Sequence, residues 1–129
     1  MKPPDHVQNV AQWQNYCRKI WARAVDLLEG RLGVIDAARE LSRLAYWTDL
    51  RSDADLTTFV AIDSETDALP VGNVRQYWSA EALQRKDPEI RHAEQLYRQA
   101  ALEAAERLTK RFAWALDARN ERRAKRTLG

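Results

Sequence analysis

The sequence predicts an all-α fold: a small helical bundle with a helical hairpin, an irregular middle segment and a long C-terminal helix. Three observations predict it. Apolar residues recur every three or four positions over long stretches of the chain. Only four Gly and four Pro are present, which favours helices over a turn-rich sandwich. The 129 residues, 45% of them hydrophobic, suffice to bury one core without disulfides or a metal, so we expect a single domain over residues 1–129.

The first predicted element is a helical hairpin of residues 8–30 and 33–47. One apolar stripe of the first helix consists of Val10, Trp13, Cys17, Ile20, Ala24 and Leu27. Gly30 stands where a left-handed residue ends that helix. The connection is so short that the two helices are expected to be antiparallel. The preceding residues 1–7 are expected to be loosely ordered.

The long C-terminal helix is predicted to run from residue 88 to about 118. Asp87 is a good N-cap, and Pro88 suits the first helical position. Many residues on its apolar face are alanines, which would let another helix approach closely. The basic residues 119–129 lose the apolar stripe, and we expect them to be loosely ordered too.

The middle segment, residues 48–86, is ambiguous because residues 57–62 are rich in strand formers. Asp53 is a suitable cap for a short helix that would bury Phe59. This short helix followed by a loop is favoured over a small hairpin made with residues 69–74. Ser79 is a candidate cap for another short helix over residues 80–84.

Charge is distributed unevenly along the chain, although the formal net charge is only +2. Residues 49–67 contain six acids and one base, and residues 107–126 contain eight bases and two acids. The two regions could pair with each other or bind different partners. The small net charge, and the lack of aromatic residues among the C-terminal bases, argue against nucleic acid as a partner.

The acidic segment contains the candidate metal ligands Asp63, Glu65 and Asp67. Carboxylates of this kind bind hard cations such as magnesium. Their spacing does not match a calcium-binding EF-hand loop, which needs more ligands and a central glycine. A polar, well-capped loop is favoured over a metal site, so no cofactor is expected.

The run from Phe59 to Gly72 reads F-V-A-I-D-S-E-T-D-A-L-P-V-G and is followed by Val74, Arg75 and Trp78. With this motif, residues 32–112 resemble a family of small bacterial proteins of unassigned function, and the resemblance implies no reaction. The acidic surface on a small helical protein is also similar in type to immunity proteins, which bind and neutralise a toxin. That similarity implies a protein partner with a basic surface. The predicted partner-binding residues are Asp53, Asp55, Asp63, Glu65, Asp67, Tyr77 and Trp78.

The favoured function is therefore a noncatalytic protein-binding module, most concretely an immunity protein. No Gly-rich phosphate loop, H-E-x-x-H, G-x-S-x-G or paired C-x-x-C motif is present. One alternative is a metal-dependent hydrolase of phosphorylated small molecules that uses Asp63, Glu65 and Asp67. Another is a homo-oligomeric structural protein, such as a homodimer paired through the alanine-rich helix. Without an apolar membrane span or signal core, we expect a cytoplasmic protein.

Overall fold

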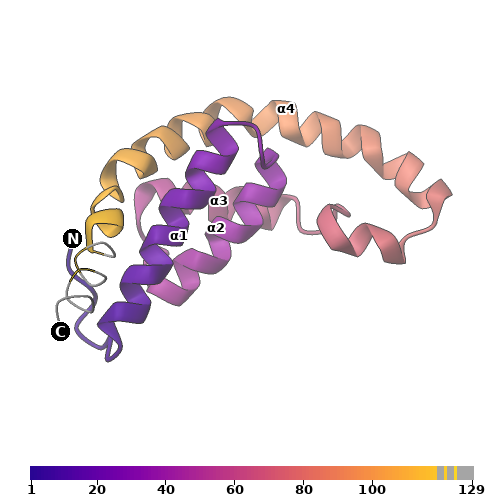
Figure 1. Ribbon diagram of the computed structural model, residues 1–129. Coiled ribbons are helices and arrows are strands. Elements are labelled where there is room, and N and C mark those ends of the chain that lie inside the picture. Colours follow the sequence, from indigo (N-terminus) through magenta and orange to yellow (C-terminus); the bar gives the residue numbers. More distant parts are fainter. Residues whose placement is uncertain (119–120, 122–123, 125–129) are drawn as a thin grey trace.

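The computed structural model describes residues 1–118, 121 and 124, and it confirms the all-α fold class (Figure 1). The described part of the chain contains no strand. Four α-helices and one 3₁₀-helix come first, and residues 114–118 are helical again after a turn at 112–113, so the long helix ends at Arg111 and not at about 118 as predicted. The bounds of the first five helices are α1 Val10–Leu28, α2 Val34–Thr48, α3 Ala54–Glu65, the 3₁₀-helix η1 Gly72–Tyr77 and α4 Ala80–Arg111. The predicted tail, residues 119–129, lies outside the described residues except for Glu121 and Ala124.

The predicted hairpin is formed by α1 and α2. Asn9 caps α1 by accepting a hydrogen bond from the Gln12 N–H at 3.0 Å. Gly30, with φ +80°, ends the helix in the left-handed conformation that glycine adopts without strain. Of the predicted stripe, Val10 is exposed and the other five residues are buried: Trp13, Cys17, Ile20, Ala24 and Leu27. Residues 1–7 form no helix, although Val7 packs against the core.

Residues 57–62 belong to helix α3, so the favoured prediction of a short helix is confirmed over the small hairpin. Asp53 caps α3, as its position in the sequence predicts. Leu56, Phe59 and Ile62 become buried against the rest of the bundle. Burial of these apolar side chains outweighs the strand preference of the segment, which is weak and depends on context.

The predicted start of the long helix at Pro88 is wrong, because α4 begins at Ala80. Ser79 caps it by accepting a hydrogen bond from the Ala82 N–H at 3.1 Å. Pro88 lies inside the helix and cannot donate to the carbonyl of Gln84, four residues earlier. Both residues are exposed, so water can bind that carbonyl and the helix continues. The predicted short helix at residues 80–84 is therefore the first part of α4.

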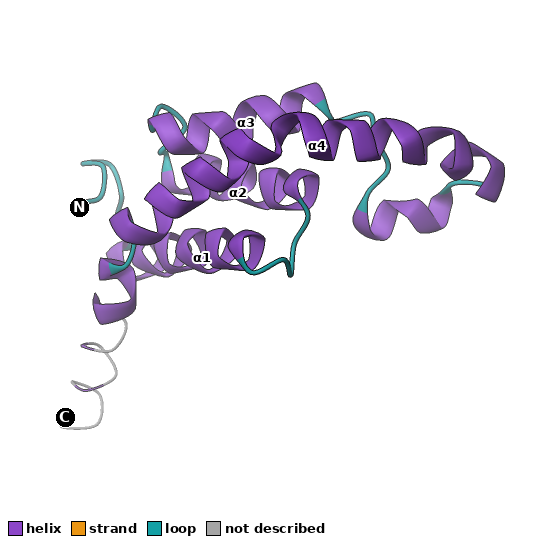
Figure 2. Cartoon of the chain, turned by 90° about the horizontal axis from the view of Figure 1, so that it is seen from above, coloured by secondary structure: helices purple, strands orange, loops and turns teal. Residues whose placement is uncertain are grey.

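The two halves of α4 have different surroundings. Its C-terminal half packs on the other helices through the buried alanines Ala101, Ala104 and Ala105, as their small side chains predict. Its N-terminal half contains no buried residue before Ala93 and extends away from the bundle together with η1 (Figure 2). We call this projecting part, residues 72–92, the arm. No helix in the described part of the chain is long and apolar enough to cross a membrane.

Candidate functional site

The seven predicted partner-binding residues lie in three separate places. Asp53 and Asp55 are at the N-terminal end of α3, Asp63, Glu65 and Asp67 are at or just after its C-terminal end, and Tyr77 and Trp78 are in the arm. A helix rises 1.5 Å per residue, so Asp53 and Asp63 are about 15 Å apart along α3. The five acids therefore do not form one continuous patch.

Asp53 is occupied by contacts within the chain. Its Oδ1 accepts hydrogen bonds from the N–H groups of Asp55, at 3.0 Å, and Leu56, at 3.2 Å. Its carboxylate also pairs with the Arg111 guanidinium of α4. Partial burial alone would raise the pKa of Asp53, but the hydrogen bonds from Arg111 and from the backbone outweigh burial and lower it. Asp53 is thus a charged cap and a link between two helices.

Asp55 is buried and neutralised by two arginines of α4. It accepts hydrogen bonds of 2.7 Å from Arg107 Nε and from Arg111 Nη1. Only 6% of Asp55 is exposed. The N-terminal part of the acidic region and the start of the basic region therefore meet each other. Asp53 and Asp55 hold α3 on α4, and a partner that used them would have to break these contacts.

The acids at the other end of α3 are more accessible. Glu65 and Asp67 are exposed, and Asp63 Oδ1 lies 3.8 Å from Arg39 Nε. The same arginine fixes the loop after α3, because its Nη2 donates to the carbonyls of Thr66, at 2.8 Å, and Leu69, at 2.6 Å. No group of three His, Cys, Asp or Glu side chains among the described residues is arranged to hold a metal ion. The geometry therefore gives the magnesium hypothesis no support.

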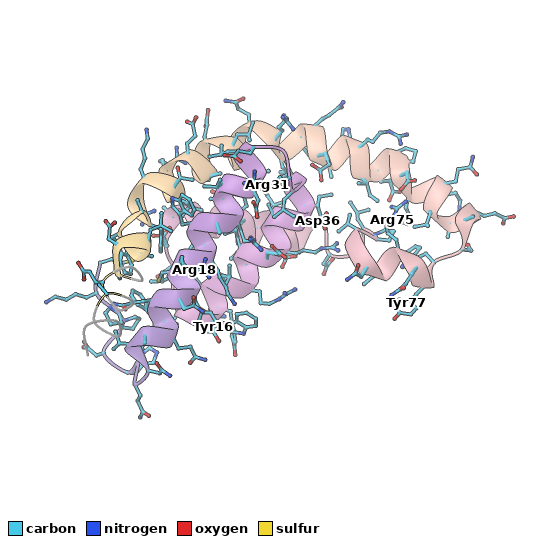
Figure 3. All side chains as sticks on the ribbon, viewed as in Figure 1. Tyr16, Arg18, Arg31, Asp36, Arg75 and Tyr77 are labelled. Carbon is cyan, nitrogen blue, oxygen red and sulfur yellow. The ribbon has the colours of Figure 1, made fainter. Side chains whose placement is uncertain are left out.

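The arm exposes its aromatic residues to solvent. Tyr77 is 82% exposed, Trp78 37% and Val74 46%, and η1 has no buried residue. Arg75 braces η1, since its guanidinium donates to the Pro70 carbonyl at 3.1 Å and to Asp87 of α4 at 2.8 and 3.3 Å. In Figure 3, Arg75 lies between η1 and α4 whereas Tyr77 points away from α4. The exposed side chains are thus presented on a fixed backbone.

Glu94 joins the base of the arm to the bundle. Gly33 offers α2 no capping side chain, and the Glu94 carboxylate of α4 accepts the N–H groups of Val34 at 2.7 Å and Ile35 at 3.1 Å instead. Asp36 lies nearby, and its pKa is raised by partial burial, with a further increase from Glu94 that is opposed by Arg39. Sequence reasoning missed Glu94. The only signal was the absence of a capping side chain before Val34.

Cys17 and the histidines show no catalytic arrangement. Cys17 is fully buried, and burial raises its pKa to about 12, so it stays a protonated thiol at neutral pH. His6 Nε2 lies 3.3 Å from Asp49 Oδ2, on the exposed N-terminal segment. His92 is exposed on α4. The interpretation of Cys17 as a core residue is confirmed.

Comparison of the chain with family models, curated proteins and solved structures finds no significant match. The resemblance of the Phe59–Gly72 motif to small bacterial proteins therefore stays a prediction. The arm and the accessible acids beside its base are the candidate site on which function is argued below.

Proposed function

We propose that this chain is a noncatalytic protein-binding module that contacts its partner through the arm. The exposure of Tyr77, at 82% of its surface, carries this proposal. Tyrosine and tryptophan are the residues most often found at the energetic centres of protein interfaces. Placing them on a braced segment outside the bundle reduces the entropy lost on binding. The pair Tyr77 and Trp78 would supply the main apolar contact.

Glu65 and Asp67 support a partner with a basic surface. Both are exposed, and both precede the arm by a short loop. Acidic side chains at the edge of an interface increase the association rate with a basic partner more than they increase affinity. The most concrete form of the proposal is an immunity protein that binds and neutralises a basic toxin. In this form Asp63 contributes through its accessible surface, and Asp53 and Asp55 keep the scaffold in place.

The test is quantitative capture of partners from the native lysate by the tagged protein. The double variant Tyr77→Ala, Trp78→Ala should lose a stoichiometric partner that the unmodified protein retains. Tyr46→Ala is the matched control, because Tyr46 is 64% exposed but lies on α2, away from the arm. Equal capture by the arm variant and the control would reject the arm as the binding element.

Charge reversal tests the electrostatic part separately. Glu65→Lys with Asp67→Lys should slow association with the captured partner, most strongly at low salt. Glu106→Lys, an exposed position on the bundle half of α4, is the control. Association rates that match this control would remove the basic partner from the proposal. If the chain captures only further copies of itself, the homo-oligomeric alternative replaces the binding module.

A further inference from the structure

A second surface, on the opposite side of the hairpin from its buried stripe, has a different chemistry. A cavity of about 370 Å³ lies between α1 and α2. We call it the α1–α2 groove. It is lined by Arg18, Lys19, Ala22 and Arg23 of α1 and by Glu40, Arg43, Leu44 and Trp47 of α2. Its volume falls within the range of small-ligand sites in proteins.

The groove carries a positive charge that the net charge of the chain conceals. Four bases and one acid line it. Arg23 is held by Asp26 at 3.0 Å and lies 3.7 Å from Glu40. Within the described residues, Lys19 and Arg43 form no ion pair. They are the charges best placed to bind an anion.

Aromatic rings hold those two bases in position. Lys19 Nζ lies 5.8 Å from the ring centre of Tyr16, and the Arg43 guanidinium lies 5.9 Å from that of Trp47. The two rings are themselves in contact, with centres 5.4 Å apart. Trp47 remains 49% exposed. Figure 3 places Tyr16 and neighbouring Arg18 on α1 along this side of the hairpin.

Two buried polar atoms at the groove have no hydrogen-bond partner. They are Arg23 Nε, a donor, and Glu40 Oε2, an acceptor. Both atoms are covered by neighbouring side chains, and Arg23 Nη1 lies 3.7 Å from Glu40 Oε2, so these two residues pair with each other and leave the groove's binding charge to Lys19 and Arg43.

We propose that the α1–α2 groove binds a nucleotide unit. Lys19 and Arg43 hold the phosphate, and the exposed Trp47 packs against the base. Positive charge beside aromatic rings is the combination by which proteins bind single-stranded nucleic acid. The nucleotide could be free or part of a strand, since both offer the same phosphate and base.

Fluorescence anisotropy with a labelled single-stranded RNA and a labelled nucleoside diphosphate tests the proposal. Both Arg43→Glu and Trp47→Ala should weaken binding by about tenfold. The matched controls, Arg85→Glu and Tyr77→Ala, change a base and an aromatic residue of the arm and should leave binding unchanged. Circular dichroism verifies that each variant is folded. Lys19→Glu, at a second exposed position of the groove, should weaken binding in the same way as Arg43→Glu.

The results separate the possible ligands. Tighter binding of the RNA than of the diphosphate supports a strand, and equal binding supports a free nucleotide. If pyrophosphate or an acidic peptide competes as well as the nucleotide, the groove recognises charge alone and the proposal is overturned. Absence of binding by both probes overturns it as well. Arm variants test the protein-binding function and groove variants test this site, so one can fail while the other holds.

Discussion

Replacing Arg111 with methionine should destabilise the fold by removing the link between α4 and the start of α3. Arg111 contacts both Asp53 and Asp55, and methionine keeps the apolar stem while removing the guanidinium. Asp55 would retain one partner, Arg107. Asp53 would retain only its backbone hydrogen bonds. The variant therefore leaves two carboxylates less well compensated without opening a large cavity.

The expected decrease in the free energy of unfolding lies between two limits. Exposed ion pairs contribute at most about 1 kcal/mol, and removing one partner of a fully buried pair costs about 3–5 kcal/mol. The Arg111 side chain is 39% exposed, so solvent screens its charge, whereas the Asp55 side chain is only 8% exposed. We expect a decrease of about 1–2 kcal/mol in the free energy of unfolding. At about 2.1 cal/mol/K of unfolding entropy per residue, this lowers Tm by about 4–7 °C.

Urea unfolding of Arg111→Met and of the control Lys110→Met, followed by circular dichroism, measures this difference. The pKa of Asp53 is lowered below its ordinary value of 3.8 by folding, so its contribution is present above that pH and is lost as the pH falls through the native pKa. The difference in the free energy of unfolding between Arg111→Met and the unmodified protein should be largest at neutral pH and decrease below about pH 4. Equal stability of the two variants, or a difference that persists in acid, would refute the reasoning.

Three further predictions concern single positions. Glu94→Ala should lower stability in urea by about 1 kcal/mol, since the first two N–H groups of α2 lose their acceptor, whereas Glu106→Ala should have little effect. Gly30→Ala should cost about 1 kcal/mol by thermal unfolding, because φ is +80° and no neighbouring atom lies within 4 Å to add a clash; Gly30→Asn should cost less. Cys17, whose pKa burial raises to about 12, should react with a thiol reagent only when the chain unfolds; labelling at the rate of an exposed thiol would contradict its burial.

Local features of the chain were enough to predict most of the helices. The spacing from Trp13 to Leu27 follows the helical repeat, and Gly30 and Asp53 act within one turn of their own positions. The error at Pro88 has the same origin, because the local cap signals at Ser79 and Asp87 do not show that a single helix continues through both positions.

The candidate site depended on contacts that sequence separation conceals. Arg111 reaches Asp55 across 56 residues, and Glu94 reaches Val34 across 60. No local rule shows which acid pairs with which base, so the sequence pattern could not distinguish the buried acids from the accessible ones. In the same way, Arg43 and Lys19 come together only when α1 and α2 pack side by side. Tyr77 and Trp78 are exposed, and their predicted role in partner binding stays a prediction.

Hydrogen–deuterium exchange of the protein with and without its captured partner tests the central claim most directly, because it locates the contact without altering a residue. Protection on binding should centre on residues 72–79, with a weaker effect at Glu65 and Asp67. Protection confined to other parts of the chain, with the exchange of residues 72–79 unchanged, would contradict the assignment of the arm as the binding element.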